Sequence, residues 1–151
     1  MDEIDKLLQQ IRANGDEVWI AGAAPDKAVA RLERALGVQL PPSYRDFLTR
    51  FGAMTVAGSP ISGIPDGEPL GEGTGWLYGD TLQFRDEWQL PEHLLVVQPD
   101  EDAPYCLDTS AADKHDELPL VCIELDSRHI DRLADSFGAW FLQWLRLQAE
   151  D

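Results

Sequence analysis

Apolar side chains recur every three or four residues in three segments of the first third of the chain, and this spacing predicts three amphipathic helices. We expect them over residues 3–14, 25–36 and 41–51, where proline opens the second and third segments. Gly37 and Gly52 follow these two helices, and glycine just past a helix end is typical of a left-handed C-cap. The residues predict a helical N-terminal third.

Short strands are predicted through the middle of the chain, separated by turn residues. Within the glycine-rich stretch that follows Gly52, strands are expected over residues 54–57 and 61–64, whereas residues 18–20 are interpreted as a connector between helices. Runs rich in β-branched or aromatic residues predict three adjacent antiparallel strands, over residues 94–98, 104–107 and 120–125.

Two more helices are predicted from local signals. Asp80-Thr81-Leu82-Gln83 has the form of a capping box, so a helix is expected from Asp80 to about Trp88. The tail from about Ser136 carries the broad apolar face of a helix that the rest of the domain covers. Helices, then short strands, then a helix predict one α+β domain over residues 1–151, with helices packed on a mostly antiparallel sheet.

A series of short motifs runs through most of the chain. Its parts are Leu36-Gly37, Leu40-Pro41-Pro42-Ser43-Tyr44-Arg45-Asp46-Phe47-Leu48, Leu90-Pro91, Pro104-Tyr105-Cys106-Leu107-Asp108, Pro119-Leu120-Val121 and Ala134-Asp135-Ser136-Phe137. This ordered set resembles the SMI1/KNR4 family of the SUKH superfamily, with its LG-x-x-LP-x-x-Y-x-x-F-L signature and Y-C-L-D strand. The chain departs from the pattern at the turn before that strand, where many relatives have G-x-G-D and this sequence has Pro99-Asp100-Glu101-Asp102-Ala103.

The resemblance implies a SUKH-like α+β fold and a bacterial immunity protein that binds and neutralises a cognate toxin domain of a polymorphic or contact-dependent system. Fungal relatives look like regulatory or scaffold proteins, so an intracellular interaction module without a toxin is the alternative. The motifs themselves carry no catalytic chemistry, because they supply buried apolar faces and turn residues. We therefore expect a protein that is not an enzyme.

Charge is concentrated in the middle of the chain. The sequence has 12 basic and 28 acidic residues, a net charge of −16, and the segment from Asp66 to Asp126 holds 16 of the acidic residues but only two basic ones, Arg85 and Lys114. Nucleic acid and anionic membranes are bound through Lys and Arg, so neither is expected as a partner. A basic protein, such as a nuclease toxin that must hold phosphates, is the predicted partner.

The predicted partner-binding surface combines aromatic anchors with surrounding carboxylates. Trp76 and Tyr78 are the expected anchors, while core packing is at least as good an interpretation for Trp88, and Trp140 and Trp144 are assigned to the core. The expected acidic residues are Asp66, Glu68, Glu72, Asp100, Glu101, Asp102, Asp113, Asp116 and Glu117.

No metal or cofactor is expected. The histidines His93, His115 and His129 lack a two-ligand spacing, and Cys106 and Cys122 form no C-x-x-C pair. Both cysteines are interpreted as small buried residues in strands, although a hydrolase using one of them with His129 stays open as a third hypothesis. Two cysteines and a start without signal-peptide features predict a cytoplasmic protein with free thiols.

Overall fold

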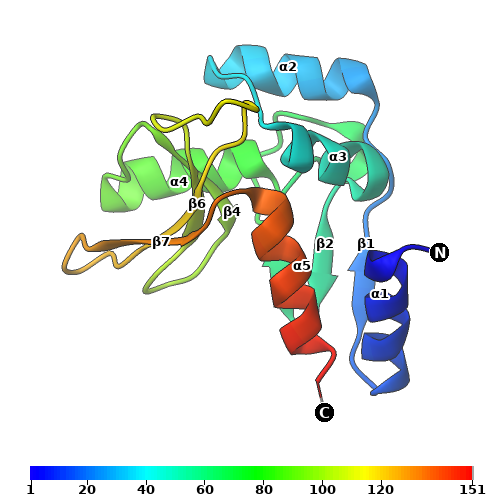
Figure 1. Cartoon of the computed structure of the whole chain (residues 1–151). Coiled ribbons are helices and arrows are strands. Elements are labelled where there is room, and N and C mark those ends of the chain that lie inside the picture. Colours follow the sequence, from blue (N-terminus) through cyan, green and yellow to red (C-terminus); the bar gives the residue numbers. More distant parts are fainter. Residues whose placement is uncertain (151) are drawn as a thin grey trace.

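Within residues 1–150, which the computed structural model describes, five α-helices surround two antiparallel sheets (Figure 1). The helices are α1 (Glu3–Ala13), α2 (Asp26–Leu36), α3 (Pro42–Phe51), α4 (Leu77–Trp88) and α5 (Phe137–Gln148), and a 3₁₀ turn, η1, spans Pro65–Gly67. In spatial order, one sheet contains β1 (Val18–Ile20), β2 (Met54–Val56) and β3 (Ser59–Ile61), and the other contains β4 (Leu94–Gln98), β5 (Tyr105–Asp108), β6 (Leu120–Ile123) and β7 (Ile130–Ala134). The predicted α+β class is confirmed.

The two sheets meet where β3 lies alongside β4. The Ser62 amide donates to the Val97 carbonyl at 2.7 Å, and the Gln98 side-chain amide donates to the Pro60 carbonyl at 3.1 Å. These bonds hold the segment after β3 against a strand that is buried along its whole length. Ser62 therefore has a fixed place, which matters for the site described below.

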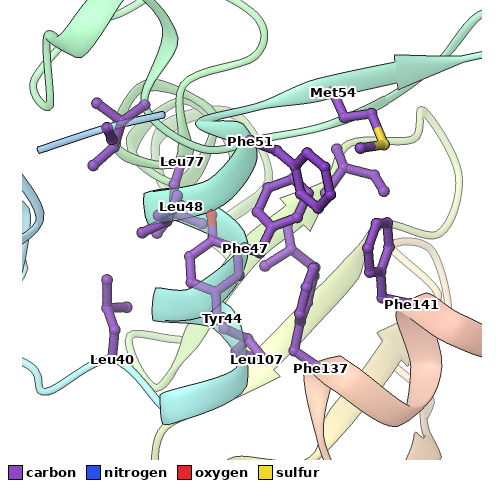
Figure 2. Packing of buried hydrophobic residues seen from close by; sticks show 14 of the residues in the cluster. Leu40, Tyr44, Phe47, Leu48, Phe51, Met54, Leu77, Leu107, Phe137 and Phe141 are labelled. Carbon is purple, nitrogen blue, oxygen red and sulfur yellow. The ribbon is translucent and has the colours of Figure 1, made fainter. Parts of the chain in front are cut away.

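An aromatic cluster joins α3 to α5 on one side of the second sheet, as Figure 2 shows. Ring centroids of Phe137 lie 4.9 Å from Tyr44 and 5.2 Å from Phe47, and Phe141 lies 5.3 Å from Phe47. Edge-to-face pairs at such distances stabilise beyond simple burial. The aromatic residues of the LP-x-x-Y-x-x-F motif thus form the centre of the core, as predicted for a structural motif.

A second apolar cluster lies between α4 and the opposite face of that sheet. It consists of Phe84, Leu90, Leu94, Val96, Cys106, Val121, Ile123 and Leu125. Alternate residues of β4 and β6 point to the two clusters, which is why both strands are nearly all buried. This packing fixes α4 as a rigid element on the sheet.

Backbone segments approach each other closely at Gly63. A Cβ atom at this position would lie 1.9 Å from the Gly52 carbonyl oxygen, so only glycine fits. The Gly63 amide donates to the Gly75 carbonyl, and the Gly63 carbonyl accepts from the Leu77 amide at 3.0 Å. Gly63 therefore ties the start of α4 to the end of β3.

Several predicted boundaries are wrong, each for a tertiary reason. Residues 18–20 form β1 because β2 is available as an antiparallel partner, and the strand expected over residues 61–64 is β3, two residues earlier. Gly52 has a positive φ of 74° but a ψ of −65°, so it forms a γ-turn in which Ala53 donates to the Phe51 carbonyl, not a left-handed cap.

Other elements agree with the sequence predictions. β4 has the predicted bounds, α5 begins after Ser136, whose hydroxyl accepts from the Ala139 amide, and Gly37 takes the left-handed conformation at the end of α2. Trp140 is buried and Trp144 packs against the core. The strand β7 was not predicted, because its residues are nearly all exposed and alternate without an apolar face.

Candidate functional site

An acidic groove lies between one face of α4 and the loop that joins β4 to β5. Its volume is about 780 Å³, and five of its lining residues are carboxylic acids, whereas no basic side chain of the described residues lines it. The lining residues are Pro60, Thr74, Asp80, Gln83, Phe84, Glu87, Trp88, Pro99, Asp100, Glu101 and Asp102. This groove is the candidate site, because it brings Asp100, Glu101 and Asp102 of the predicted set together with aromatic side chains.

Helix α4 supplies one wall of the groove at helical spacing. Asp80, Gln83, Phe84, Glu87 and Trp88 recur at intervals of three and four residues, so they share one face of the helix. The helix begins at Leu77, three residues before the predicted start. Its first turn needs no side-chain cap, since the Gly63 carbonyl accepts from the Leu77 amide, and the predicted capping box at Asp80 is therefore wrong.

Asp80 is a buried carboxylate at the base of this wall. Its residue is 2% exposed, and its Oδ2 atom accepts hydrogen bonds from the Ser62 hydroxyl and from the Gly75 amide at 3.2 Å. Burial raises the pKa of Asp80, although both hydrogen bonds favour the charged form and act in the opposite direction. The carboxylate is therefore held by neutral donors alone.

The tyrosine of the family-like motif supports this arrangement from the core. The Tyr44 hydroxyl donates to the Ser62 carbonyl at 2.6 Å, so the residue that donates to Asp80 is itself fixed by α3. Burial, together with the negative charge of Asp80, raises the pKa of Tyr44 well above its ordinary value. Tyr44 thus stays a neutral donor and positions Ser62.

Trp88 ends α4 at the other end of the groove wall and is 40% exposed. The Arg128 guanidinium, from the turn between β6 and β7, donates to the carbonyls of Trp88 and Gln89 at 2.7 Å each. These bonds satisfy free carbonyls of the helix end and place a cation where the helix dipole favours one. The Trp88 indole is therefore attached to a fixed backbone and is accessible to a partner. Core packing, which was one interpretation of Trp88 from the sequence, does not describe its position.

The β4–β5 loop forms the opposite wall. Asp100 Oδ2 accepts from the amides of Asp102 and Ala103 at 3.0 and 2.9 Å, which closes a tight turn without the glycines that the family pattern has there. The side chains of Glu101 and Asp102 are exposed at the groove. The departure from the family pattern therefore adds negative charge at a built turn.

The other predicted site residues lie outside the groove lining: Tyr78 is in the first turn of α4, and the rest are in two further loops. Asp66, Glu68 and Glu72 are exposed in the loop before α4, where the Trp76 indole donates to the Glu68 carbonyl at 2.9 Å. The indole also covers Gly71, so a Cβ atom there would lie 2.4 Å from the ring. Tyr78 is half-buried and packs against the core.

The third group lies in the β5–β6 loop, which runs beside α2 and α3 in Figure 1 (yellow). Asp116 is exposed, and Asp113 accepts from the amides of His115 and Glu117, which lowers the pKa of Asp113. Glu117 accepts from the Ser43 amide at 2.9 Å and from the Ser43 hydroxyl at 2.8 Å. Glu117 therefore holds the N-terminus of α3.

Neither cysteine has the environment of a nucleophile. Both are free, and burial raises the pKa of the Cys106 thiol strongly. The pKa of the Cys122 thiol is raised by partial burial and by nearby carboxylates. The reactive form is the thiolate, which a raised pKa disfavours. His129, the base of the hydrolase hypothesis, contacts the Asp131 carboxylate at 2.8 Å.

One grouping of potential metal ligands was not visible in the sequence. Ligand atoms of Glu124, His129 and Asp131 lie within 4.8 Å of one another, since the β6–β7 hairpin brings them together. All three side chains are exposed, and such surface groupings are common without an ion. Within residues 1–150, no helix is long and apolar enough to cross a membrane.

These features define an α+β domain with an acidic, partly aromatic groove. The family model described as SMI1-KNR4 cell-wall (SUKH_5) matches residues 4–146, so the chain belongs to this family, and the resemblance seen in the motifs is confirmed. The family is of the immunity and scaffold type and is generally non-enzymatic.

The chain is also similar to the crystal structure of a protein from Pseudomonas syringae pv. tomato. The TM-score is 0.54 at 15% sequence identity, and the match covers 77% of this chain and 81% of that chain. At this identity the likeness concerns the fold alone.

Proposed function

We propose that this protein is a cytoplasmic immunity protein that binds and neutralises a cognate toxin domain through its acidic surface. The observation that carries the proposal is the groove between α4 and the β4–β5 loop, in which five carboxylates and Trp88 converge on a fixed scaffold. Family membership supports this class of protein, and the groove is the surface that we propose for the partner.

The charge of this surface favours a basic partner. Between Asp66 and Asp126 there are 16 acidic and two basic residues. Of the two basic residues, Arg85 donates to the Glu92 carbonyl at 2.8 Å and lies 3.8 Å from its carboxylate. Apart from Arg128, which is bonded to the Trp88 and Gln89 carbonyls at the end of α4, little local positive charge opposes the field of the groove. A nuclease toxin must be cationic to hold phosphates, so an acidic inhibitor is attracted to the surface that substrate uses.

Affinity and rate have different sources in this proposal. Exposed acids, including Asp66, Glu68, Glu72, Asp113 and Asp116, raise the association rate through the long-range field, and the effect falls with salt. Affinity depends on aromatic side chains that become buried when the complex forms. Trp88 is the most accessible tryptophan near the acids, so it is the main candidate for such a contact. Trp76 and Tyr78 stay predicted contacts at the edge of this surface.

The test begins with the genes that neighbour this one in its native host, and each candidate toxin domain that they encode is coexpressed with this protein. We expect this protein to restore growth of cells that express the toxin, and the purified pair to associate more slowly as salt is added. Replacing Asp100, Glu101 and Asp102 with lysine should slow association severalfold at low salt. A matched control replaces three exposed acids far from this segment of the sequence, Asp16, Glu17 and Asp26.

Two results would contradict the proposal. Failure to restore growth, with no complex formed, would remove the immunity function and favour an interaction module without a toxin. An equal loss of rate in the two triple variants would show that net charge, and not the β4–β5 loop, governs association.

A further inference from the structure

Asp80 is unusual among the acids of the groove because it is almost completely buried. Both of its hydrogen bonds end on Oδ2, and no described residue donates a hydrogen bond to Oδ1. Asp80 also lines the groove, so its Oδ1 atom is available as an acceptor to a ligand that enters the groove. Oδ1 is not among the buried side-chain atoms that lack a partner, so it is accessible at the groove, where a ligand can supply a hydrogen-bond donor.

No basic side chain of the described residues compensates this charge. Arg85, the one cation on α4, is directed toward Glu92, and no ion pair involves Asp80. Glu87, Glu101 and Asp102 add further negative charge at the rim. The missing component is therefore a cation that reaches from the rim to the floor of the groove.

The dimensions of α4 indicate the shape of this cation. Residues four positions apart on a helix rise about 6 Å, so Phe84 lies about 6 Å and Trp88 about 12 Å along the axis from Asp80. An arginine side chain spans roughly the first of these distances with its methylene groups and guanidinium. Its methylenes would lie over Phe84, and the adjacent backbone of the partner would rest against Trp88.

Arginine suits this site better than lysine. A guanidinium is more weakly hydrated than an ammonium, so it is less costly to bring beside a buried carboxylate. Its planar fork of donors also permits simultaneous bonds to the floor and to the rim carboxylates. We propose that the groove receives one arginine side chain of the partner protein, with Asp80 Oδ1 as acceptor and with Trp88 as a contact for the flanking residues. This inference rests on the proposed function in taking the partner to be a basic protein.

A direct test uses a short peptide as the probe. The acetylated and amidated peptide Gly-Gly-Arg-Gly-Gly is titrated into the ¹⁵N-labelled protein, and amide shifts are followed by NMR. We expect saturable shifts confined to α4, Thr74 and residues 99–102. The same peptide with lysine should bind more weakly, and the peptide with citrulline, which lacks the charge, should not bind.

Matched variants distinguish the contributions of Asp80 and Trp88 to peptide binding from the general effect of negative charge. Asp80→Asn should weaken the affinity for the arginine peptide about tenfold, whereas Asp86→Asn, on the same helix but outside the groove, should change it less than about twofold. Trp88→Ala should weaken binding, and Trp19→Ala, which removes another exposed tryptophan, should not. The Trp88 and Asp86 variants leave the hydrogen bonds of Asp80 intact, so the test does not depend on the fold of Asp80→Asn.

The inference is overturned if the shifts spread over the whole acidic surface, if citrulline or lysine peptides bind as well as arginine, or if Asp86→Asn weakens binding as much as Asp80→Asn. Its failure differs from failure of the proposed function. A toxin complex that keeps its affinity in Asp80→Asn and Trp88→Ala would refute the arginine site but not the immunity function. Localised binding of the arginine peptide, without rescue of cells that express the toxin, would support the arginine site and contradict the immunity function.

Discussion

Glu117 provides the sharpest test of the structure, because the sequence placed it on the binding surface and the fold gives it a structural role. Its carboxylate accepts from the amide and the hydroxyl of Ser43, and the Ser43 hydroxyl in turn accepts from the Gly138 amide at 2.9 Å. One side chain thus joins the β5–β6 loop to the first turns of α3 and α5. We predict that Glu117→Ala destabilises the protein measurably.

The magnitude follows from the two bonds. A hydrogen bond to a charged group contributes about 1.5–3 kcal/mol, and loss of a helix N-cap costs about 0.5–2 kcal/mol. Ser43 and Glu117 are partly exposed, so water replaces some of the loss. We expect the free energy of unfolding to fall by about 2 kcal/mol in Glu117→Ala. For a domain of this size the melting temperature should fall by about 4–8 °C.

Equilibrium unfolding in urea, followed by tryptophan fluorescence, measures this loss. Asp116→Asn is the matched control, since it removes the same charge from the adjacent exposed residue and asparagine tolerates the φ of 63° at this position, so it should change the free energy of unfolding by less than about 0.5 kcal/mol. If the two variants are equally stable, Glu117 does not hold α3, and its predicted place on the docking surface regains support.

Three further predictions concern the backbone, a buried carboxylate and the thiols. Gly63→Ala should reduce the free energy of unfolding by more than about 3 kcal/mol, because the new Cβ atom would overlap the Gly52 carbonyl oxygen. Urea unfolding should show this as a large drop in the midpoint, and a variant as stable as wild type would show that the contact can relax. Burial raises the pKa of Asp80, so its contribution to stability is complete below the ordinary Asp pKa and is lost as pH rises through the folded-state value. The stability of wild type relative to Asp80→Asn should therefore fall as pH rises above about 4, and a constant difference would contradict this prediction. Alkylation by iodoacetamide at neutral pH, measured by mass spectrometry, should be slow at Cys122 and should require unfolding at Cys106. Rapid labelling of either thiol in the native protein would support the cysteine hydrolase hypothesis.

The sequence alone predicted elements that depend on local patterns. The apolar stripes of the N-terminal helices, the bounds of β4, the start of the last helix near Ser136 and the α+β class are all confirmed, because hydrophobic periodicity acts within a few residues. The concentration of acids in the middle of the chain was likewise readable without coordinates.

The candidate site was predicted only in part. Asp100, Glu101 and Asp102 were identified from charge, whereas Asp80 was taken for a helix cap and Trp88 was left between core and surface. The signal that would have grouped Trp88 with Asp80 is the stripe of 80, 83, 84, 87 and 88 on one face of the predicted helix, but only the tertiary structure shows that this face lines a groove.

What the chain determines by itself is therefore its local elements, its apolar faces and its charge. Tertiary structure decided where those elements begin, since the Gly63 carbonyl replaces a side-chain cap at Leu77, and it decided which acids are free, since Ser43 engages Glu117 while Asp80 keeps one oxygen unbonded. The physical reason is that a hydrogen bond between residues far apart in sequence has the same strength as a local one, yet leaves no local pattern by which to predict it.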